Sequence, residues 1–205
     1  MPLVGTRPVA DFASGPLVSQ PTGDPWVLEG AHILQLMYEL DQSAMTALLP
    51  PALHPTIPPT LVVTVLRAPA SPAGPFVLAE AKVGCRSGAR PRALSLRAYC
   101  DSAEAAQALA ERWGHPVATA DVQLKKRYDR CWATVALDGA TVLDAHLADP
   151  EPISGNDIQY LANLNAARIE RSGEVVPRLI QVDPEYRFHS ADRGRPELKA
   201  FDAGA

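Results

Sequence analysis

Twenty prolines in a chain of 205 residues constrain this fold more than any other feature of the sequence. Because proline lacks a backbone N–H and fixes φ, it suits turns, strand ends and sheet edges rather than helix interiors. Before residue 76 we therefore expect a single short helix, over residues 42–49, which Asp41 caps and the Pro50-Pro51 pair ends. The prolines of this first third that support the argument are Pro16, Pro21, Pro25, Pro50, Pro51, Pro55, Pro58, Pro59, Pro69, Pro72 and Pro75.

Short strands account for most of the remaining chain. Turn residues such as Asp138-Gly139 join several of them. Between the strands we expect a polar loop at 148–157 and a mixed segment up to Arg171. The apolar, β-branched segments that predict strands are 26–38, 61–68, 76–85, 92–99, 119–128, 131–137, 141–146 and 174–182, with 186–190 as one more.

One longer helix has clear boundary signals. Asp101-Ser102-Ala103-Glu104 matches a capping box, in which side chains satisfy the first backbone N–H groups. The Ala-rich segment 103–113 follows, and Gly114 stands where a glycine commonly ends a helix. The sequence therefore predicts a helix over residues 103–113.

Many short strands and few helices favour a mainly-β or α+β fold, an antiparallel β-barrel or sandwich with a few peripheral helices. A parallel sheet would need regular alternation of strands and helices, which the sequence lacks. The length fits one domain over residues 1–205, in which the Pro-, Gly- and Ser-rich residues 1–25 form an irregular N-terminal arm over the surface.

Charge and composition exclude several classes of function. The net charge is -4 and the one basic run is Lys125-Lys126-Arg127, which argues against a nucleic-acid partner. The sequence has neither a long apolar stretch for a membrane span nor a signal peptide. Its three cysteines fit neither a disulfide framework nor a metal-ligand spacing. We expect a soluble, reduced, cytoplasmic protein with no metal and no cofactor.

The order of several segments resembles the acetoacetate decarboxylase family. The likeness is clearest from about residue 22 to 150 and extends more weakly to Phe201. It implies a β-barrel around a buried apolar pocket, and suggests a homo-oligomer. The segments that carry it are Tyr38–Leu53, Leu61–Arg67, Ser71-Pro72-Ala73-Gly74-Pro75-Phe76 up to Glu80, Tyr99–Ala106, and Glu111-Arg112-Trp113-Gly114-His115-Pro116.

In that family a lysine at the corner after the helix forms a Schiff base with the substrate ketone, and the family reads Pro-Lys-Lys there. This chain reads Pro116-Val117-Ala118, so the amine is absent. The family's carboxylate-binding arginine falls on or beside Ala31, and one of its two pocket glutamates falls on Val65. The other glutamate matches Glu80. The resemblance thus implies Val65, Val117 and Ala118 as apolar lining of the substrate pocket.

The strongest candidates for catalysis are Glu80 and His115. If Glu80 points into an apolar pocket, we expect burial to raise its pKa toward that of a general acid or base, whereas an exposed strand position would make it ordinary. His115 occupies the corner that supplies the family's amine, so it is placed for proton transfer; the alternative is a simple helix C-cap.

Three further residues complete the candidate site. Arg97 interrupts an apolar strand and suits a two-pronged contact to a carboxylate or enolate, although strand alternation equally places it in solvent. His32 lies beside the lost arginine position and is a candidate replacement. Lys82 shares a strand face with Glu80, which suggests either an ion pair or a relocated amine.

These observations predict an enzyme that binds a small organic acid, ketone or polyketide-like intermediate without amine catalysis. Acid/base chemistry by Glu80 with His115 or Arg97 would then drive a dehydration, isomerisation, aldol-type or cyclisation step in specialised-metabolite biosynthesis. Two alternatives stay open, a non-catalytic binding protein and a decarboxylase or aldolase that uses Lys82.

Overall fold

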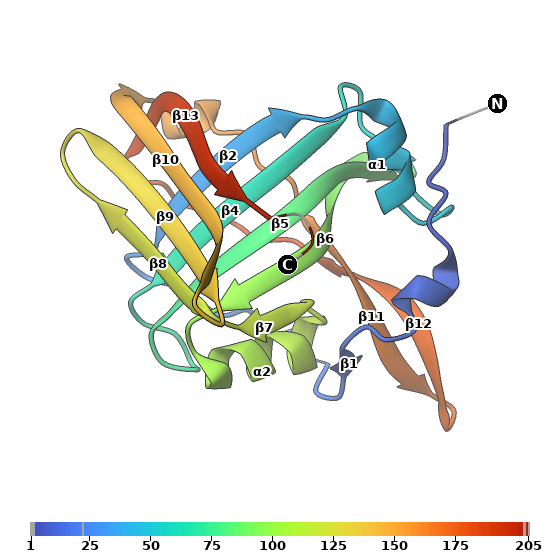
Figure 1. The fold of residues 1–205 in the computed structure, drawn as a ribbon. Helices are drawn as coiled ribbons and strands as arrows, with labels where there is room; N and C mark the ends of the chain where they lie inside the picture. Colours follow the sequence, from blue (N-terminus) through green and yellow to red (C-terminus); the bar gives the residue numbers. More distant parts are fainter. Residues whose placement is uncertain (1–2, 22, 203, 205) are drawn as a thin grey trace.

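The computed structural model describes residues 3–21, 23–202 and 204. Met1, Pro2 and Thr22 of the predicted arm, with Ala203 and Ala205, lie outside the described residues. Figure 1 shows a mainly-β arrangement. The described residues form two α-helices. The elements are η1 Val9–Phe12, β1 Leu17–Val18, β2 His32–Glu39, α1 Gln42–Leu48, β3 His54–Pro55, β4 Thr60–Ala68, β5 Phe76–Ser87, β6 Arg90–Cys100, α2 Ala103–Trp113, β7 Val117–Thr119, β8 Asp121–Lys126, β9 Arg130–Leu137, β10 Ala140–Ile153, η2 Gly155–Asp157, β11 Asn163–Arg171, β12 Glu174–Val182 and β13 Ala191–Phe201.

The described strands form two sheets. The larger sheet has nine strands with the main order β1-β11-β6-β5-β4-β2, while β12 pairs with β11, β3 with β5 and β7 with β6. The smaller sheet has the order β13-β10-β9-β8. The mainly-β prediction is confirmed, but the two sheets do not close into one hydrogen-bonded barrel.

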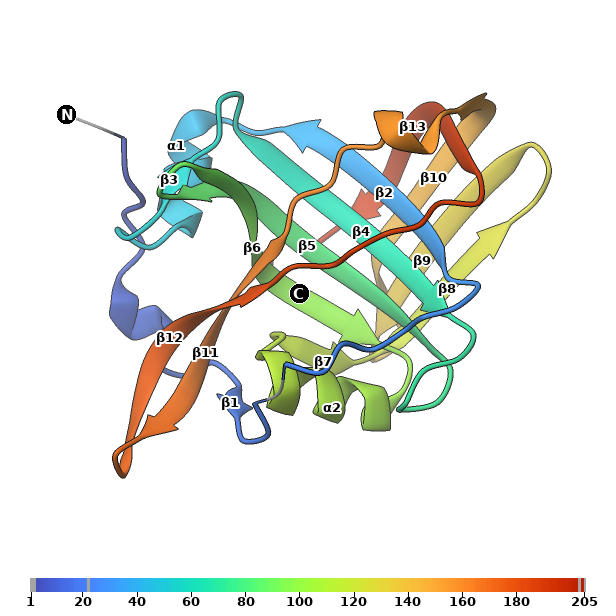
Figure 2. The ribbon, with the colours of Figure 1, turned by 180° about the vertical axis from the view of Figure 1, so that it is seen from behind.

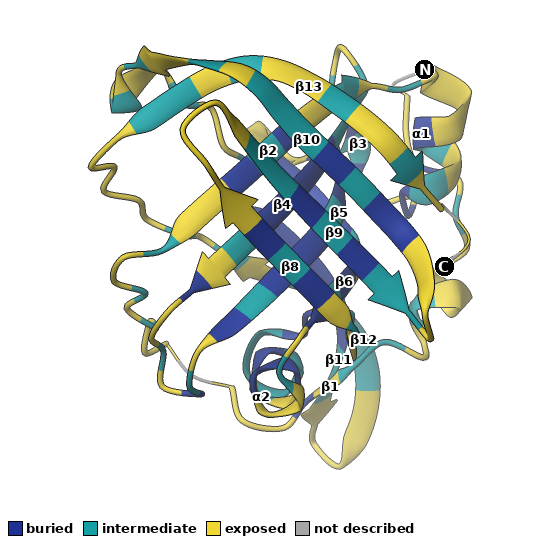
Figure 3. Cartoon of the chain, turned by 60° about the vertical axis from the view of Figure 1, so that its left-hand side comes forward, coloured by how far each residue is buried: buried dark blue, intermediate teal, exposed yellow. Residues whose placement is uncertain are grey.

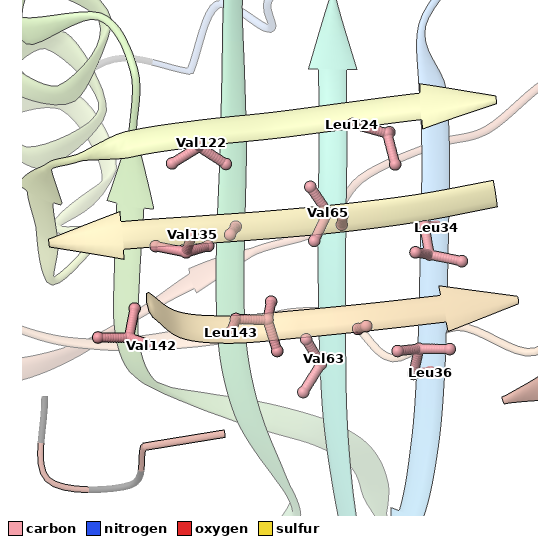
Figure 4. Packing of buried hydrophobic residues seen from close by; sticks show 12 residues of the cluster. Leu34, Leu36, Val63, Val65, Val122, Leu124, Val135, Val142 and Leu143 are labelled. Carbon is pink, nitrogen blue, oxygen red and sulfur yellow. The ribbon is translucent and has the colours of Figure 1, made fainter. Parts of the chain in front are cut away.

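One face of the larger sheet packs against the smaller sheet and contains the main hydrophobic core. The residues that face this core occupy alternate positions, as at Leu34 and Leu36 of β2 and Val63 and Val65 of β4. Strands β8, β9 and β10 cross them and contribute apolar side chains such as Val135 (Figure 4). Figure 3 shows the buried positions gathered where the sheets overlap. Burial of this face fixes which residues of β4, β5 and β6 point the other way.

The opposite face of the larger sheet is covered by α2 and by two connecting segments, 154–162 and 183–190, which run across it in Figure 2. The side chain of Gln35 on β2 donates a hydrogen bond of 2.8 Å to the backbone oxygen of Gln159, which ties the first segment to the sheet. The rings of Tyr160 and Tyr186 meet edge to face with centroids 4.7 Å apart, which joins the two segments. Polar residues of the larger sheet are enclosed on this side.

Helix α2 begins and ends as the sequence predicts. Ser102 caps it by accepting a hydrogen bond from the backbone N–H of Ala105, and Gly114 ends it with φ 68°, in the left-handed region that favours glycine. A Cβ at Gly114 would lie 2.4 Å from the Cβ of Ala167, so the close approach of β11 also requires glycine. This turn places the next residue, His115, in the interior.

Several predicted boundaries are wrong. Residues 148–153 of the predicted polar loop continue β10, because pairing with β13 satisfies their backbone across a bulge between Ala148 and Glu151. The mixed segment contains β11, and the predicted strand 186–190 is instead a connection to β13. The first long strand starts at His32, since Trp26 packs edge to face on Trp113 instead. Segment β13 is a polar edge strand without apolar alternation, which is why its sequence gave no strand signal.

Candidate active site

Four polar side chains meet on the enclosed face of the larger sheet. The Nδ1 of His115 lies 2.9 Å from Oε1 of Glu80, and Nζ of Lys82 donates to Oε2 of Glu80 at 3.4 Å. Lys82 also donates to Oδ1 of Asn163 at 3.2 Å, and the amide of Asn163 donates to both carboxylate oxygens at 3.4 Å. All four residues are buried. We call Glu80, Lys82, His115 and Asn163 the polar cluster.

Three separate elements bring these residues together. Alternation along β5 places Glu80 and Lys82 on the same face, and a bulge in the β5–β6 pairing follows Ala81. The turn at Gly114 supplies His115, and Asn163 is the first residue of β11, which pairs in parallel with β6. Local structure fixes each position, whereas their meeting depends on sheet order.

The carboxylate of Glu80 is ionised, contrary to the expectation of a raised pKa. Burial alone would raise the pKa of Glu80, but the charges of Lys82 and His115 and the hydrogen bonds they donate outweigh it and hold the pKa well below its usual range. Glu80 is therefore an acceptor that orients its neighbours and not a proton donor near neutral pH. Burial raises the pKa of Tyr186 to about 12, and the nearby negative charge of Glu80 and the Tyr160 side chain contribute to the same shift.

A cleft of about 410 Å³ borders the polar cluster at His115. Such a volume is within the range of small-molecule sites, about 300–1,000 Å³. Because Nδ1 of His115 is held by Glu80, Nε2 is the ring atom available to a molecule in the cleft; no hydrogen bond to it is found within the described part of the chain. Ser95 and Val117 line the same cleft, and Arg7 of the N-terminal arm faces them.

The structure places four of the predicted site residues away from the polar cluster. Arg97 is exposed and pairs with Ala81, so alternation puts it on the face opposite Glu80. Val65 is 1% exposed in the core between the sheets, beside Ala79 and not beside Glu80. His32 and Ala118 are exposed. Of the sequence-based candidates, the structure brings together Glu80, Lys82 and His115, with Val117 on the adjoining cleft wall.

Sequence reasoning missed several residues at this site. Asn163 lies 83 residues from Glu80, in a segment with no clear strand pattern. Ser95 is buried with no hydrogen-bond partner for Oγ in the described structure, and the same holds for Oγ1 of Thr64, which pairs directly with Glu80 across β4 and β5. Arg7 belongs to the arm treated as irregular. Nothing in the local sequence distinguishes these four residues, because long-range pairing alone places them here.

Other reactive groups of the described residues do not form a second centre. No group of three His, Cys, Asp or Glu side chains that could hold a metal ion occurs in residues 3–21, 23–202 and 204. Burial raises the pKa of the Cys85 thiol to about 12 and also raises that of Cys100, so neither supplies a thiolate near neutral pH. No helix among these residues has the length and apolar character required to cross a bilayer.

Comparison with known proteins gives a consistent result. Residues 14–202 match the family model described as acetoacetate decarboxylase. A structure of acetoacetate decarboxylase from Legionella pneumophila superposes with a TM-score of 0.77 at 16% identity, covering 88% of this chain and 75% of that one. An acetoacetate decarboxylase-like enzyme from Sphingomonas wittichii RW1 gives a TM-score of 0.69 at 17% identity, covering 87% and 79%.

A further similar structure is the enduracididine biosynthesis enzyme MppR in complex with the condensation product of pyruvate and imidazole 4-carboxaldehyde. It gives a TM-score of 0.69 at 16% identity and covers 85% of this chain and 76% of that one. A search of the curated proteins finds no match. At these identities the structural likeness establishes the fold, and the reaction must be argued from the residues of this chain.

Proposed function

The chain belongs to the acetoacetate decarboxylase family, and on that premise we propose that it is an acid/base enzyme that moves a proton on a small keto acid without forming a Schiff base. The observation that carries this proposal is the buried pair of His115 and Glu80, 2.9 Å apart, beside a cleft of small-molecule size. The reaction class is a lyase, isomerase or cyclase step, such as a dehydration. One structural relative takes part in biosynthesis, which supports a similar setting for this protein.

The family's amine chemistry has no obvious agent here. Val117 and Ala118 occupy the corner where the resemblance implies two lysines. Lys125, Lys126 and Lys199 are exposed. Lys82 is buried, but its ammonium is paired with the ionised Glu80. Because a protonated amine cannot attack a carbonyl, this pairing opposes Schiff-base formation.

The geometry instead favours His115 as the proton carrier. The carboxylate of Glu80 accepts the hydrogen bond from Nδ1–H, so whenever the ring is uncharged its lone pair is on Nε2. Nε2 takes a proton from the carbon next to a substrate carbonyl; the C–H electron pair forms a C=C bond and the carbonyl oxygen becomes an enolate oxygen. Glu80 stabilises the resulting imidazolium, as a carboxylate does in other histidine pairs.

The proton then leaves Nε2 in one of two ways. Returned to a different carbon, it completes an isomerisation. Delivered to a β-hydroxyl that departs as water with the C–O electron pair, it completes a dehydration. Lys82 and Asn163 hold Glu80 in place and compensate its buried charge, so they act as positioning residues.

Solvent exchange tests this proposal directly. In D2O we expect the protein to accelerate deuterium incorporation at the α-carbon of some members of a panel of 2-keto and 3-keto acids, followed by NMR. His115→Gln should lower the exchange rate on the order of 100-fold, the scale of general base catalysis, and Glu80→Gln should also lower it. His32→Gln is the matched control, since that histidine is exposed. Exchange that survives in His115→Gln refutes the assignment.

The burial of Lys82 in the same cluster makes amine catalysis the second candidate. Incubation with acetoacetate or pyruvate and borohydride, followed by intact mass measurement, separates the two. We expect no reduced adduct in the native protein. An adduct mapped to Lys82 would establish amine catalysis instead, and ligand binding without any exchange would indicate a non-catalytic binding protein.

A further inference from the structure

The N-terminal arm is attached to the body on both sides of the cleft. On one side, the backbone N–H of Arg7 donates to the oxygen of Leu49 at 2.9 Å. On the other, Nε of Arg168 donates to the oxygen of Gly15 at 2.7 Å, and β1 continues in parallel pairing with β11. Residues 8–14 therefore span between two fixed points and form one wall of the cleft.

Arg7 is held so that part of its guanidinium is available. Its Nε is 3.4 Å from Oδ2 of Asp11, and its Cζ lies 4.8 Å from the centre of the Phe12 ring. These contacts involve Nε and one face of the guanidinium. No partner for the two terminal amino groups is found among the described residues, and the side chain is 34% exposed. Paired amino groups of this kind match the two oxygens of a carboxylate.

A second, independent feature of the cleft also indicates a polar ligand. Ser95 is 5% exposed, lines the cleft and has no hydrogen-bond partner for Oγ in the described chain. A buried hydroxyl without a partner costs free energy, so such groups are usually satisfied by water or by a ligand. The cleft is thus lined by Arg7 of the arm, with its ion-pair partner Asp11, and by a residue of β6 whose buried hydroxyl is unsatisfied.

We propose that this cleft is a carboxylate-binding site, in which the terminal amino groups of Arg7 hold the two oxygens of a small organic acid and the Ser95 hydroxyl donates a hydrogen bond to the ligand. The inference rests on the proposed function for the role of His115, which borders the same cleft, but the binding itself does not depend on turnover. It assigns substrate selection to residues 8–14 and Arg7 of the arm, which precede β1.

Binding measurements test the proposal with probes that differ in charge. The probes are pyruvate, acetoacetate, their methyl esters and inorganic phosphate, and the measurement is calorimetry or ligand-observed NMR. We expect each acid to bind more tightly than its ester, and Arg7→Gln to weaken acid binding about 10- to 100-fold, the scale of a charge-assisted contact, while ester binding is unchanged. Ser95→Ala should weaken the acids less than Arg7→Gln. Arg171→Gln, at the exposed end of β11, is the matched control and should change nothing.

The outcomes separate this inference from the proposed function. Acid binding that is unaffected by Arg7→Gln, or lost equally in Arg171→Gln, overturns the carboxylate site even if His115 supports exchange. Failure of both acids to bind also overturns it. Phosphate that binds as tightly as the acids would replace the carboxylate assignment with a general anion site. Conversely, Arg7-dependent acid binding without exchange sustains the inference and contradicts only the proposed enzyme activity. Thermal melting of each variant checks that the arm substitution leaves the fold intact.

Discussion

Replacing Glu80 by Gln tests whether the polar cluster is a coupled set of buried charges. The substitution conserves size and leaves one side-chain oxygen, so it creates no cavity and acts mainly by removing charge. Lys82 would then keep its buried ammonium with neutral amide oxygens as acceptors, Oδ1 of Asn163 at 3.2 Å among them, and His115 would lose its ionised partner. Removing one member of a buried ion pair costs about 3–5 kcal/mol of unfolding free energy. For a chain of this length that corresponds to a decrease in Tm of about 6–20 °C.

Urea unfolding followed by tryptophan fluorescence measures this loss. The double variant Glu80→Gln/Lys82→Met removes both charges. We expect its loss of unfolding free energy to be about 0.5–3 kcal/mol smaller than the losses of the two single variants added together. Lys126→Met is the control, because it breaks an exposed ion pair with Asp192 at 2.7 Å and should cost less than about 1 kcal/mol. A change in Glu80→Gln as small as that of Lys126→Met would refute the reasoning, since it would mean that water already compensates the charges of the cluster.

Three further predictions concern pH, the helix end and the exposed arginine. Because folding lowers the pKa of Glu80, its contribution to stability is present above its unfolded pKa, about 4.3, and is lost progressively as pH falls below that value. In urea titrations the difference in unfolding free energy between the native protein and Glu80→Gln should therefore shrink between pH 6 and pH 3. A constant difference would contradict this prediction. Gly114→Ala should lower Tm and abolish the deuterium exchange, because Gly114 has φ 68° and an added Cβ would lie 2.4 Å from the Cβ of Ala167. Both effects would disturb the turn that positions His115. Unchanged melting would show that the turn adapts. Arg97→Gln should leave both exchange and acid binding unchanged, because Arg97 is exposed on the face opposite Glu80, and a loss of either would return it to the site.

The sequence predicts local structure correctly where neighbouring residues alone determine it. The Ser102 cap and Gly114 define α2 without reference to the rest of the fold, and the alternation of β5 places Glu80 and Lys82 on one face. The position of His115 follows from the end of that helix. Each of these inferences uses neighbours within a few residues, where the backbone periodicity is fixed.

What the sequence could not give depends on long-range pairing. Asn163 enters the polar cluster because β11 pairs in parallel with β6, and no local pattern encodes that partner. The lowered pKa of Glu80 could not be predicted for the same reason. The sequence indicated that Glu80 would be buried, but not that Lys82 and His115 would lie close enough to compensate its charge. Val65 lies on the face opposite Glu80 because it pairs with Ala79, and the side of a sheet that a residue faces changes with a shift of one residue in register.

Restoring an amine at the corner is the sharpest test of why this chain departs from amine chemistry. Val117 lines the cleft and pairs with Ala98, which in turn pairs with Glu80, so all three side chains lie on the same face of the sheet. Val117→Lys therefore directs a second lysine toward the polar cluster. The carboxylate of Glu80 would then be the single negative charge beside two amines, that of Lys82 and that of the introduced lysine. Repulsion between the two positive charges should leave one amine unprotonated and nucleophilic near neutral pH. We expect this variant to trap acetoacetate with borohydride, with the adduct mapped to position 117.

Ala118→Lys is the matched control, because Ala118 pairs with Tyr99 and is exposed, so alternation directs its side chain away from the cluster and no adduct should form. Equal trapping at both positions would show that any lysine near this corner reacts, and no trapping at position 117 would show that the cluster holds every nearby amine in its protonated form. The first outcome would contradict the role of orientation toward the polar cluster, and the second would mean that the missing lysine is not what separates this chain from amine catalysis.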